Sequence, residues 1–244
     1  FCPSSKKRCR SCNVNVCAKH ASSANGCCGP CLDAVMQAAA DGRITTQEED
    51  DAIEAVGGER AALYGEITIL GMRTLAARLD LSPNDTFADL GSGLGKATFQ
   101  AVQEFECTRS VGVEMAGSRH ELAEAALASD AFADVVDRIQ LVQADCSDAS
   151  LWSHPNGALH GVTVIYMGSL MFSVELMDRL ARLVEKSLTV RAVATLKRFG
   201  DSPTGFTESA PPEVCETSWT APIRIGDANG IKDPGCPVFI YIRA

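Results

Sequence analysis

A glycine-rich loop carries the residues best suited to chemistry. Residues 89–96 read Asp-Leu-Gly-Ser-Gly-Leu-Gly-Lys, between a predicted buried strand and a predicted helix. Glycines let the backbone turn tightly and approach a ligand, with the helix N-terminus behind it. A dinucleotide site has two residues between its second and third glycines, whereas only Leu94 separates Gly93 from Gly95 here. The loop therefore predicts a nucleotide-like cofactor other than a dinucleotide.

Acidic residues at the ends of three predicted strands narrow that choice. Asp89 ends the first strand and would oppose a phosphate, but it suits a cationic or hydrogen-bond-donating cofactor. Glu114 ends the second strand, where an acid can bind ribose hydroxyls, and Asp145 follows the third, where it can accept from an adenine amine. S-adenosylmethionine (SAM), with its amino group and sulfonium, fits this pattern. The alternative is a dehydrogenase-like or ligand-free Rossmann domain.

The first 31 residues hold a second cluster of potential ligands, with spacings typical of zinc knuckles. Soft ligands two residues apart can reach one tetrahedral ion from a single tight turn. The segment has almost no large apolar residues, so a metal would have to supply its folding free energy. One zinc site would take Cys9, Cys12, Cys28 and Cys31, and a second would take Cys2, Cys17, His20 and Cys27. A disulfide knot is the alternative, which the absence of a secretory signal disfavours.

Charge divides the chain in the same way. Residues 1–31 contain five lysines and arginines and no acid, whereas the whole chain has a net charge of −9. The acidic balance argues against strong sequence-independent binding of nucleic acid, leaving the N-terminal segment as the one candidate for such contact. No run of residues is apolar enough to span a membrane. These features predict an intracellular protein with a zinc module at 1–31, a helical lead-in at 32–80 and a catalytic domain at 81–244.

The lead-in is expected to be helical. Residues 32–40 predict a short helix, and Thr45 with Glu48 form a capping box opening a second helix that ends at Gly57 and Gly58. Apolar residues recur at helical spacing from Gly65 to about Leu79. The segment is therefore expected to end in an amphipathic helix.

Alternating strands and helices follow, which specify a parallel sheet with right-handed crossovers. The fold class expected is a Rossmann-like α/β domain with a mostly parallel sheet and a C-terminal antiparallel hairpin, plus the zinc module. The predicted strands are 86–90, 110–114, 139–144, 162–166 and 190–196, the predicted helices are 94–105, 118–128 and 174–188, and the hairpin strands are 214–220 and 238–242.

Several motifs together resemble the non-SET histone lysine methyltransferases, the family named for disruptor of telomeric silencing. The resemblance covers about residues 60–244. The glycine loop is shared with many SAM enzymes, whereas the placement of Tyr64-Gly65-Glu66 and of Ser218-Trp219 narrows the match. The other matching segments are 111–114 (Val-Gly-Val-Glu), the Phe172 segment, 196–199 (Leu-Lys-Arg-Phe) and Tyr241.

The resemblance implies roles for individual residues. Tyr64, Glu66 and Thr68 would lie in a loop over the methionine part of SAM. The cofactor cleft would be lined by Asp89, Gly91, Ser92, Gly93, Gly95 and Lys96, with Glu114 on the ribose and Asp145 and Cys146 at the adenine. Phe172, Trp219 and Tyr241 would wall a lysine channel, with Tyr64 and Ser169 as the nearest polar groups.

The sequence departs from the family in two places. The family's segment after the fourth strand bears an asparagine, whereas residues 166–172 here read Tyr-Met-Gly-Ser-Leu-Met-Phe. Cys146 stands where the family tends to place an aromatic residue.

The sequence thus predicts a SAM-dependent protein methyltransferase acting on lysine, with a histone or nucleosome as substrate and a nuclear location. Methyl transfer mainly requires positioning of the reactants and exclusion of water. One alternative is a cytoplasmic enzyme acting on a non-histone protein or a small molecule. Another is a zinc-based adaptor on a lapsed SAM domain, which the intact glycine loop and strand-end acids disfavour.

Overall fold

The computed structural model describes residues 42–44, 46–220 and 235–244, and the backbone of four two-residue strands near the N-terminus. These strands are β1 (Lys7–Arg8), β2 (Asn15–Val16), β3 (Ala21–Ser22) and β4 (Cys27–Cys28), in two antiparallel pairs. The predicted helix at 32–40 and the side chains of all eight predicted zinc ligands lie outside the described residues.

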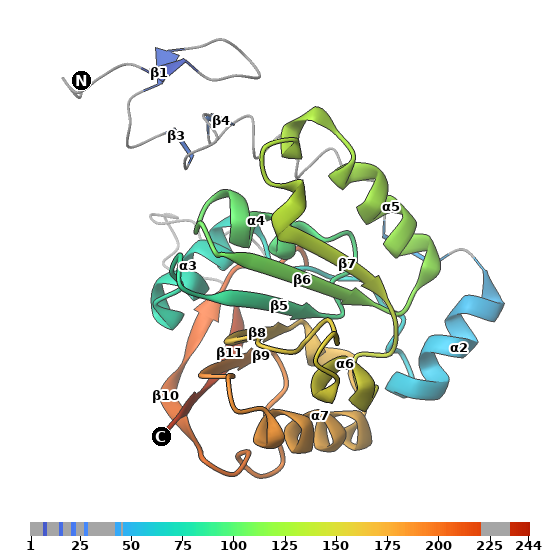
Figure 1. Ribbon diagram of the computed structural model, residues 1–244. Coiled ribbons are helices and arrows are strands. Elements are labelled where there is room, and N and C mark those ends of the chain that lie inside the picture. Colours follow the sequence, from blue (N-terminus) through green and yellow to red (C-terminus); the bar gives the residue numbers. More distant parts are fainter. Residues whose placement is uncertain are drawn as a thin grey trace, which may run out of the picture.

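A seven-stranded sheet forms the centre of the described domain (Figure 1). Its order is β10-β11-β9-β8-β5-β6-β7. The five strands from β9 to β7 are parallel, and β11 pairs antiparallel with both β9 and β10. The strands are β5 (Thr86–Leu90), β6 (Arg109–Glu114), β7 (Ile139–Gln143), β8 (Val164–Met167), β9 (Ala192–Thr195), β10 (Phe206–Cys215) and β11 (Cys236–Arg243).

Helices cover both faces of this sheet (Figure 1). One face carries α3 (Ile69–Leu79), α4 (Lys96–Gln103) and α5 (Gly117–Leu127), and the other carries α6 (Ala149–Ser153) and α7 (Val174–Lys186). The remaining α-helix of the described residues, α2 (Gln47–Gly57), lies beyond the C-terminal ends of the parallel strands. None of the helices in the described part of the chain is long and apolar enough to cross a membrane.

Alternation along the strands explains the two faces. Ala88 and Ile165 belong to the core beneath α6 and α7, whereas their neighbours Phe87 and Tyr166 belong to the core beneath α3 and α4. Strands covered on both faces are expected to be apolar almost throughout, as β5, β8 and β9 are. The polar residues that interrupt this pattern are therefore conspicuous, and Asp89 is one of them.

The predicted alternation of five parallel strands with helices is confirmed, with the elements displaced by one to three residues at some ends. The amphipathic helix begins at Ile69 rather than Gly65, because Ile67 forms an isolated antiparallel bridge with Thr217 and Thr68 caps the helix. The capping box predicted to open the helix at Thr45 is wrong, and the helix predicted from Ser118 begins one residue earlier. The helices begin after Thr46 and Ala116, and neither of these residues makes a side-chain cap hydrogen bond.

The C-terminal antiparallel hairpin is also confirmed, but its first strand is placed earlier than expected. Strand β10 starts at Phe206 and ends at Cys215, not at Thr220. It runs through Pro211 and Pro212, with a register shift between Ser209 and Glu213. Proline is tolerated there because β10 is an edge strand, where a missing N–H breaks no central ladder.

Candidate functional site

A cleft opens where the parallel strands end. Strand β5 lies between β6, which follows it in the chain, and β8, which the chain reaches after β7, so the sheet extends from β5 in two opposite directions. Ligands of such sheets bind outside the carboxyl ends of the strands at this switch point. The cleft contains about 940 Å³ of empty space including its open mouth, within the range of about 300–1,000 Å³ usual for small-molecule sites.

The glycine loop forms the floor of the cleft at the end of β5. Gly91, Gly93 and Gly95 all have positive φ angles, of 83°, 53° and 78°. A Cβ atom on Gly91 would lie 3.2 Å from Cζ of Phe172, and one on Gly93 would lie 3.0 Å from Cε2 of Tyr64. Larger side chains at these positions would be strained in the backbone and would crowd both aromatic rings.

Glu114 is held rigidly at the end of β6. Its Oε2 accepts a hydrogen bond of 2.7 Å from the backbone N–H of Gly93, and its Oε1 accepts one of 2.9 Å from Ala116. The side chain is 6% exposed. Each carboxylate oxygen has a further lone pair for a ligand hydroxyl, because an ionised carboxylate offers about four acceptor sites in all.

Asp89 lies beside Glu114 and has no such partners. It is 4% exposed, and its Oδ1 atom has no hydrogen-bond partner among the described residues. Burial, with smaller contributions from the charges of Glu114 and Glu66, raises the pKa of Asp89 to about 8. A buried carboxyl group without a partner is costly to ionise. A cationic ligand in the cleft would relieve that cost.

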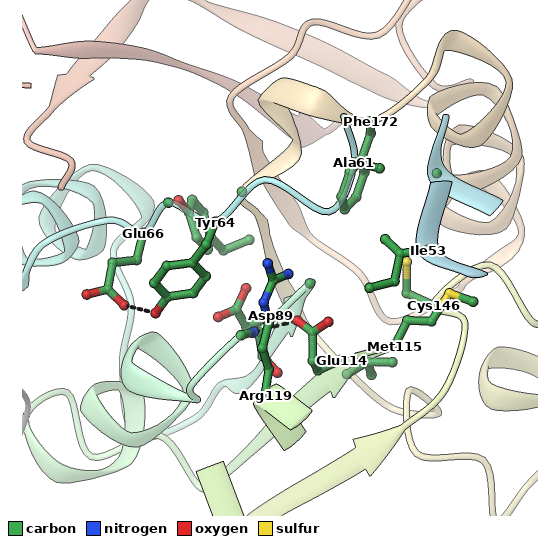
Figure 2. Close-up of a pocket in the computed structure, with 18 of the residues that line it drawn as sticks. Ile53, Ala61, Tyr64, Glu66, Asp89, Glu114, Met115, Arg119, Cys146 and Phe172 are labelled. Carbon is green, nitrogen blue, oxygen red and sulfur yellow. Dashed lines mark hydrogen bonds between the residues drawn. The ribbon is translucent and has the colours of Figure 1, made fainter. Parts of the chain in front are cut away.

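Residues 53–67 cross the cleft as a cover, here called the lid (Figure 2). Within it, the hydroxyl of Tyr64 donates to Glu66, which also accepts from the ammonium group of Lys96 at the start of α4. Burial, and then the charge of Glu66, raise the pKa of Tyr64 well above its ordinary value, so the phenol stays protonated. Because Lys96 follows the glycine loop, this network joins the lid to the floor of the cleft.

Arg119 fastens the lid from the opposite side. Its guanidinium group is buried and donates to the backbone carbonyls of Gly42, at 2.8 Å, and of Ala62. Its Cζ atom lies 5.1 Å from the centre of the Tyr64 ring, a cation–π contact. One side chain of α5 thus connects two points of the lead-in that are twenty residues apart.

The two ends of the cleft differ in polarity (Figure 2). Tyr64 and Glu66 lie at one end, whereas Ile53, Met115 and Cys146 form an apolar surface at the other. Asp145 adjoins the apolar end, and its Oδ1 accepts from the backbone and hydroxyl of Ser147, each at 2.8 Å. The arrangement suits an elongated ligand with an apolar ring at one end, hydroxyls in the middle and a charged group at the other.

The structure brings together most of the residues predicted for the site. Eleven of the predicted residues line the cleft, namely Tyr64, Glu66, Asp89, Gly91, Ser92, Gly93, Lys96, Glu114, Asp145, Cys146 and Phe172. Five others do not, namely Thr68, Gly95, Ser169, Trp219 and Tyr241.

Each of these five has other contacts. Thr68 caps α3 and donates to Glu216, and Gly95 is the residue preceding α4. Ser169 is fully buried and accepts from the backbone of Lys197. Tyr241 is fully buried in the core, where its ring packs edge-on against Phe199.

Trp219 is 45% exposed and packs against the backbone of the lid. A Cβ atom on Gly65 would lie 2.5 Å from its ring. Ser218 beside it exchanges two hydrogen bonds with Glu66, one in each direction. This segment therefore supports the lid from outside, and the role of Trp219 in a lysine channel stays a prediction.

Sequence reasoning missed two polar residues of the cleft, Arg119 and Tyr166. Arg119 sits in a helix of mixed composition, where an arginine ordinarily faces solvent. Tyr166 lies in an apolar strand and is taken for a core residue on that pattern. Their position in the sequence could have indicated both residues, because each lies at or just beyond the carboxyl end of a predicted parallel strand.

The predicted zinc module is not tested by this geometry. Among the residues that the structure describes, no three His, Cys, Asp or Glu side chains are grouped closely enough to hold a metal ion. Cys107, Cys146, Cys215 and Cys236 are buried free thiols, as expected for small apolar residues.

Comparison with known proteins identifies the family. Residues 58–210, well over half of the chain, match the family described as "Histone methylation protein DOT1". The chain belongs to the DOT1 family. This match includes the glycine loop, the three strand-end acids and Phe172, but it ends before Trp219 and Tyr241.

Curated relatives match a shorter stretch. A histone-lysine N-methyltransferase, H3 lysine-79 specific, from Yarrowia lipolytica is 42% identical over 62 residues. The protein of the same name from Eremothecium gossypii is 37% identical over 65 residues. These stretches cover 25% and 27% of this chain but 12% and 11% of the two relatives. The match thus spans about a tenth of the length of those proteins.

Solved structures with a similar chain path include two methyltransferases. An RNA methyltransferase from Salinibacter ruber, in complex with S-adenosyl-L-homocysteine, is 20% identical with a TM-score of 0.42, covering 70% of this chain and 86% of that chain. The methyltransferase domain of bacterial CtHen1 is 14% identical with a TM-score of 0.47, covering 72% and 97%. At these values neither structure bears on the activity of this chain.

Proposed function

We propose that this protein is a SAM-dependent methyltransferase that modifies a lysine of a histone, with the nucleosome as its form of substrate. The observation that carries the proposal is the row of acids along one cleft, with Asp89 left without a partner beside the glycine loop. Membership of the DOT1 family and the names of the curated relatives support the choice of substrate. A nuclear location follows from that substrate.

The residues of the cleft fit SAM. The unpartnered Oδ1 of Asp89 suits the cofactor's ammonium group, and the fixed carboxylate of Glu114 suits the two ribose hydroxyls. Ile53, Met115 and Cys146 offer an apolar surface for adenine, beside Asp145, whose Oδ2 atom is not used by the two bonds from Ser147. The glycines leave the backbone of the loop without side chains, so a ligand can approach it, and a Cβ atom on Gly91 or Gly93 would crowd Phe172 or Tyr64. When bound, SAM would supply an electrophilic methyl group.

The protein's own contribution is to position the acceptor and exclude water. Phe172 lies beside Ala61 of the lid (Figure 2), and both line the cleft, so that a lysine side chain would enter between apolar groups. Such surroundings favour the neutral amine, because burial destabilises a charged ammonium group. Glu66 accepts hydrogen bonds from Tyr64 and from Lys96, so neither Tyr64 nor Glu66 is free to act as a base. Positioning and desolvation are therefore the principal catalytic means.

A methyl-transfer assay tests the activity and the substrate together. Labelled SAM is offered with nucleosomes, with free histones and with undermethylated whole-cell protein. We expect a labelled histone band, strongest on nucleosomes. Label found only in other proteins would support the proposed methyltransferase activity but contradict the proposed histone substrate. No label at all, despite SAM binding, would indicate a small-molecule acceptor or a zinc-based adaptor with a lapsed SAM domain.

A matched pair of variants makes the assay specific to the cleft. Glu114→Gln preserves the size of the side chain but removes the charge expected to hold the ribose, so transfer should fall by about 100-fold. Glu208→Gln makes the same change on edge strand β10, where the glutamate pairs with the exposed Arg198, and should leave transfer unchanged. Equal activity of the two variants would contradict the cofactor assignment.

We further propose that the first 31 residues bind one or two zinc ions through their seven cysteines and His20. The spacing of these ligands and the basic charge of the segment support a module that recognises a protein or nucleic acid partner. Metal analysis of protein purified without chelator should give one or two zinc ions per chain. A zinc content below half an ion per chain would contradict the proposal.

A further inference from the structure

Tyr166 is a second unpartnered polar group in the cleft. The residue is 3% exposed, and its hydroxyl, which keeps some exposure to the cleft, forms no hydrogen bond with any described residue. A tyrosine hydroxyl in a largely buried side chain usually has a hydrogen-bond partner, and at the wall of a cleft a ligand can supply it. The residue lines the same cleft as Asp89.

Strand register places Tyr166 directly beside Asp89. The two residues are Cα partners in the parallel pairing of β8 with β5, on the face of the sheet that carries α3 and α4. The hydroxyl also reaches past the end of its strand, because a Cβ atom on Gly168 would lie 3.9 Å from it. Two adjacent strands thus deliver an unpartnered carboxyl oxygen and an unpartnered hydroxyl to the switch point of the sheet.

The neighbouring glutamates of the cleft are hydrogen-bonded to other groups. Glu66 accepts from Tyr64 and Lys96, and Glu114 accepts from two backbone N–H groups. Among the described residues, neither glutamate forms a hydrogen bond with Tyr166 or Asp89. A ligand group that fits between these two must donate to the carboxyl oxygen and both donate to and accept from a hydroxyl, and an α-amino acid group does so.

On the basis of the proposed function, we infer that Tyr166 binds the α-amino acid group of the cofactor, in a socket shared with Asp89. The phenol accepts a hydrogen bond from the ammonium group and donates its own proton to the neighbouring α-carboxylate. Burial, and then the charge of Asp89, raise the pKa of Tyr166 well above its ordinary value, so the proton is present for donation.

Two adenosine ligands separate this role from a structural one. S-adenosylhomocysteine carries the α-amino acid group, whereas 5′-methylthioadenosine keeps the adenosine and the thioether and lacks that group. For Tyr166→Phe we expect binding of S-adenosylhomocysteine to weaken by about 10-fold or more, since hydrogen bonds to charged groups are involved. Binding of methylthioadenosine should remain within about 2-fold, because none of its atoms reaches the socket.

Tyr241→Phe is the matched control. It also removes one buried tyrosine hydroxyl from the same sheet, but that hydroxyl accepts from the backbone of Phe199 in the core, away from the cleft. Both ligands should bind this variant as they bind the wild type, with thermal unfolding confirming that each protein is folded.

Calorimetric titration of the full chain with both ligands decides the matter. Selective loss of S-adenosylhomocysteine binding in Tyr166→Phe supports the inference. Unchanged binding of both ligands, or an equal loss of both, would overturn it. If the wild type binds neither ligand, it is the proposed cofactor that fails, and this outcome differs from either result on the variant.

Discussion

Two aspartates at opposite ends of β5 have opposite surroundings. Asp85, just before the strand, accepts hydrogen bonds from Ser82, from Thr163 at 2.8 Å and from two nitrogens of Arg191 at 2.7 and 2.8 Å. Asp89, at the other end, has an oxygen with no partner among the described residues. Burial alone would raise the pKa of both groups. In Asp85 the bonds from Arg191, Thr163 and Ser82 outweigh burial and hold the pKa below its ordinary range.

The contrast separates Asp85, whose hydrogen bonds stabilise the fold, from Asp89, whose unpartnered oxygen is available to a ligand. Asp85 ties the start of β5 to β8 and to the start of β9, at the closed end of the sheet. Asp89 contributes nothing comparable to the packing and is costly to keep ionised. Natural structures rarely leave a buried polar atom unsatisfied, and such an exception is a reason to look for function.

The largest effect expected from this difference between Asp85 and Asp89 is that of Asp89→Asn on ligand binding. Removing the charge opposite a buried ammonium group should weaken S-adenosylhomocysteine binding by about 100-fold. The free energy of unfolding without ligand should stay the same or rise, because no protein partner is lost. Calorimetric titration and thermal unfolding measure the two quantities. Undiminished ligand affinity in the folded variant would show that Asp89 does not contact the ligand.

Asp85→Asn should have the reverse signature. It leaves Arg191 without its charged partner, and we expect the free energy of unfolding to fall by about 2–4 kcal/mol. Because the folded-state pKa of Asp85 is lowered, this stabilisation is present above the unfolded pKa of about 4 and is lost as pH falls through the folded value. Denaturant unfolding at pH 7 should reveal the deficit, while ligand affinity of the folded variant stays unchanged. A stable variant with impaired binding would reverse the two assignments.

A smaller effect is expected from Arg119→Lys, which tests whether ligand binding in the cleft depends on the contacts that hold the lid. Lysine keeps the charge but cannot reach the carbonyls of Gly42 and Ala62 together, so cofactor binding should weaken by about 10-fold as the lid loosens.

Arg243→Lys controls for this change. Arg243 also donates to backbone carbonyls, those of Val190 and Ser187, and lies 4.4 Å from the centre of the Phe206 ring, but it is remote from the cleft. It should lower thermal stability without altering affinity. Equal affinities of the two variants would exclude a role for the Arg119 contacts in binding.

Local patterns predicted the parts of this molecule whose signal is contiguous in the sequence. The parallel strands are short apolar runs, and the glycine loop and its acids stand at their ends. Pairing between distant segments could not be anticipated. The bridge between Ile67 and Thr217 shortens α3, and the position of β10 on the sheet edge accommodates two prolines within a strand. Tyr166 lies at the cleft because of its strand register, and Arg119 because it donates to the carbonyls of Gly42 and Ala62. Neither arrangement produces a periodic pattern in the sequence.

Proton release on ligand binding tests the central claim most directly. With a pKa of about 8, Asp89 is largely protonated at pH 7 in the ligand-free protein and must ionise to pair with an ammonium group. Calorimetric titrations with S-adenosylhomocysteine at pH 7, in buffers of different ionisation enthalpy, count the protons exchanged. We predict release of about one proton per ligand in the wild type, with affinity rising up to pH 8, and none in Asp89→Asn. No release from the wild type, or the same release from both proteins, would contradict the claim that Asp89 is held unpaired for a cationic ligand.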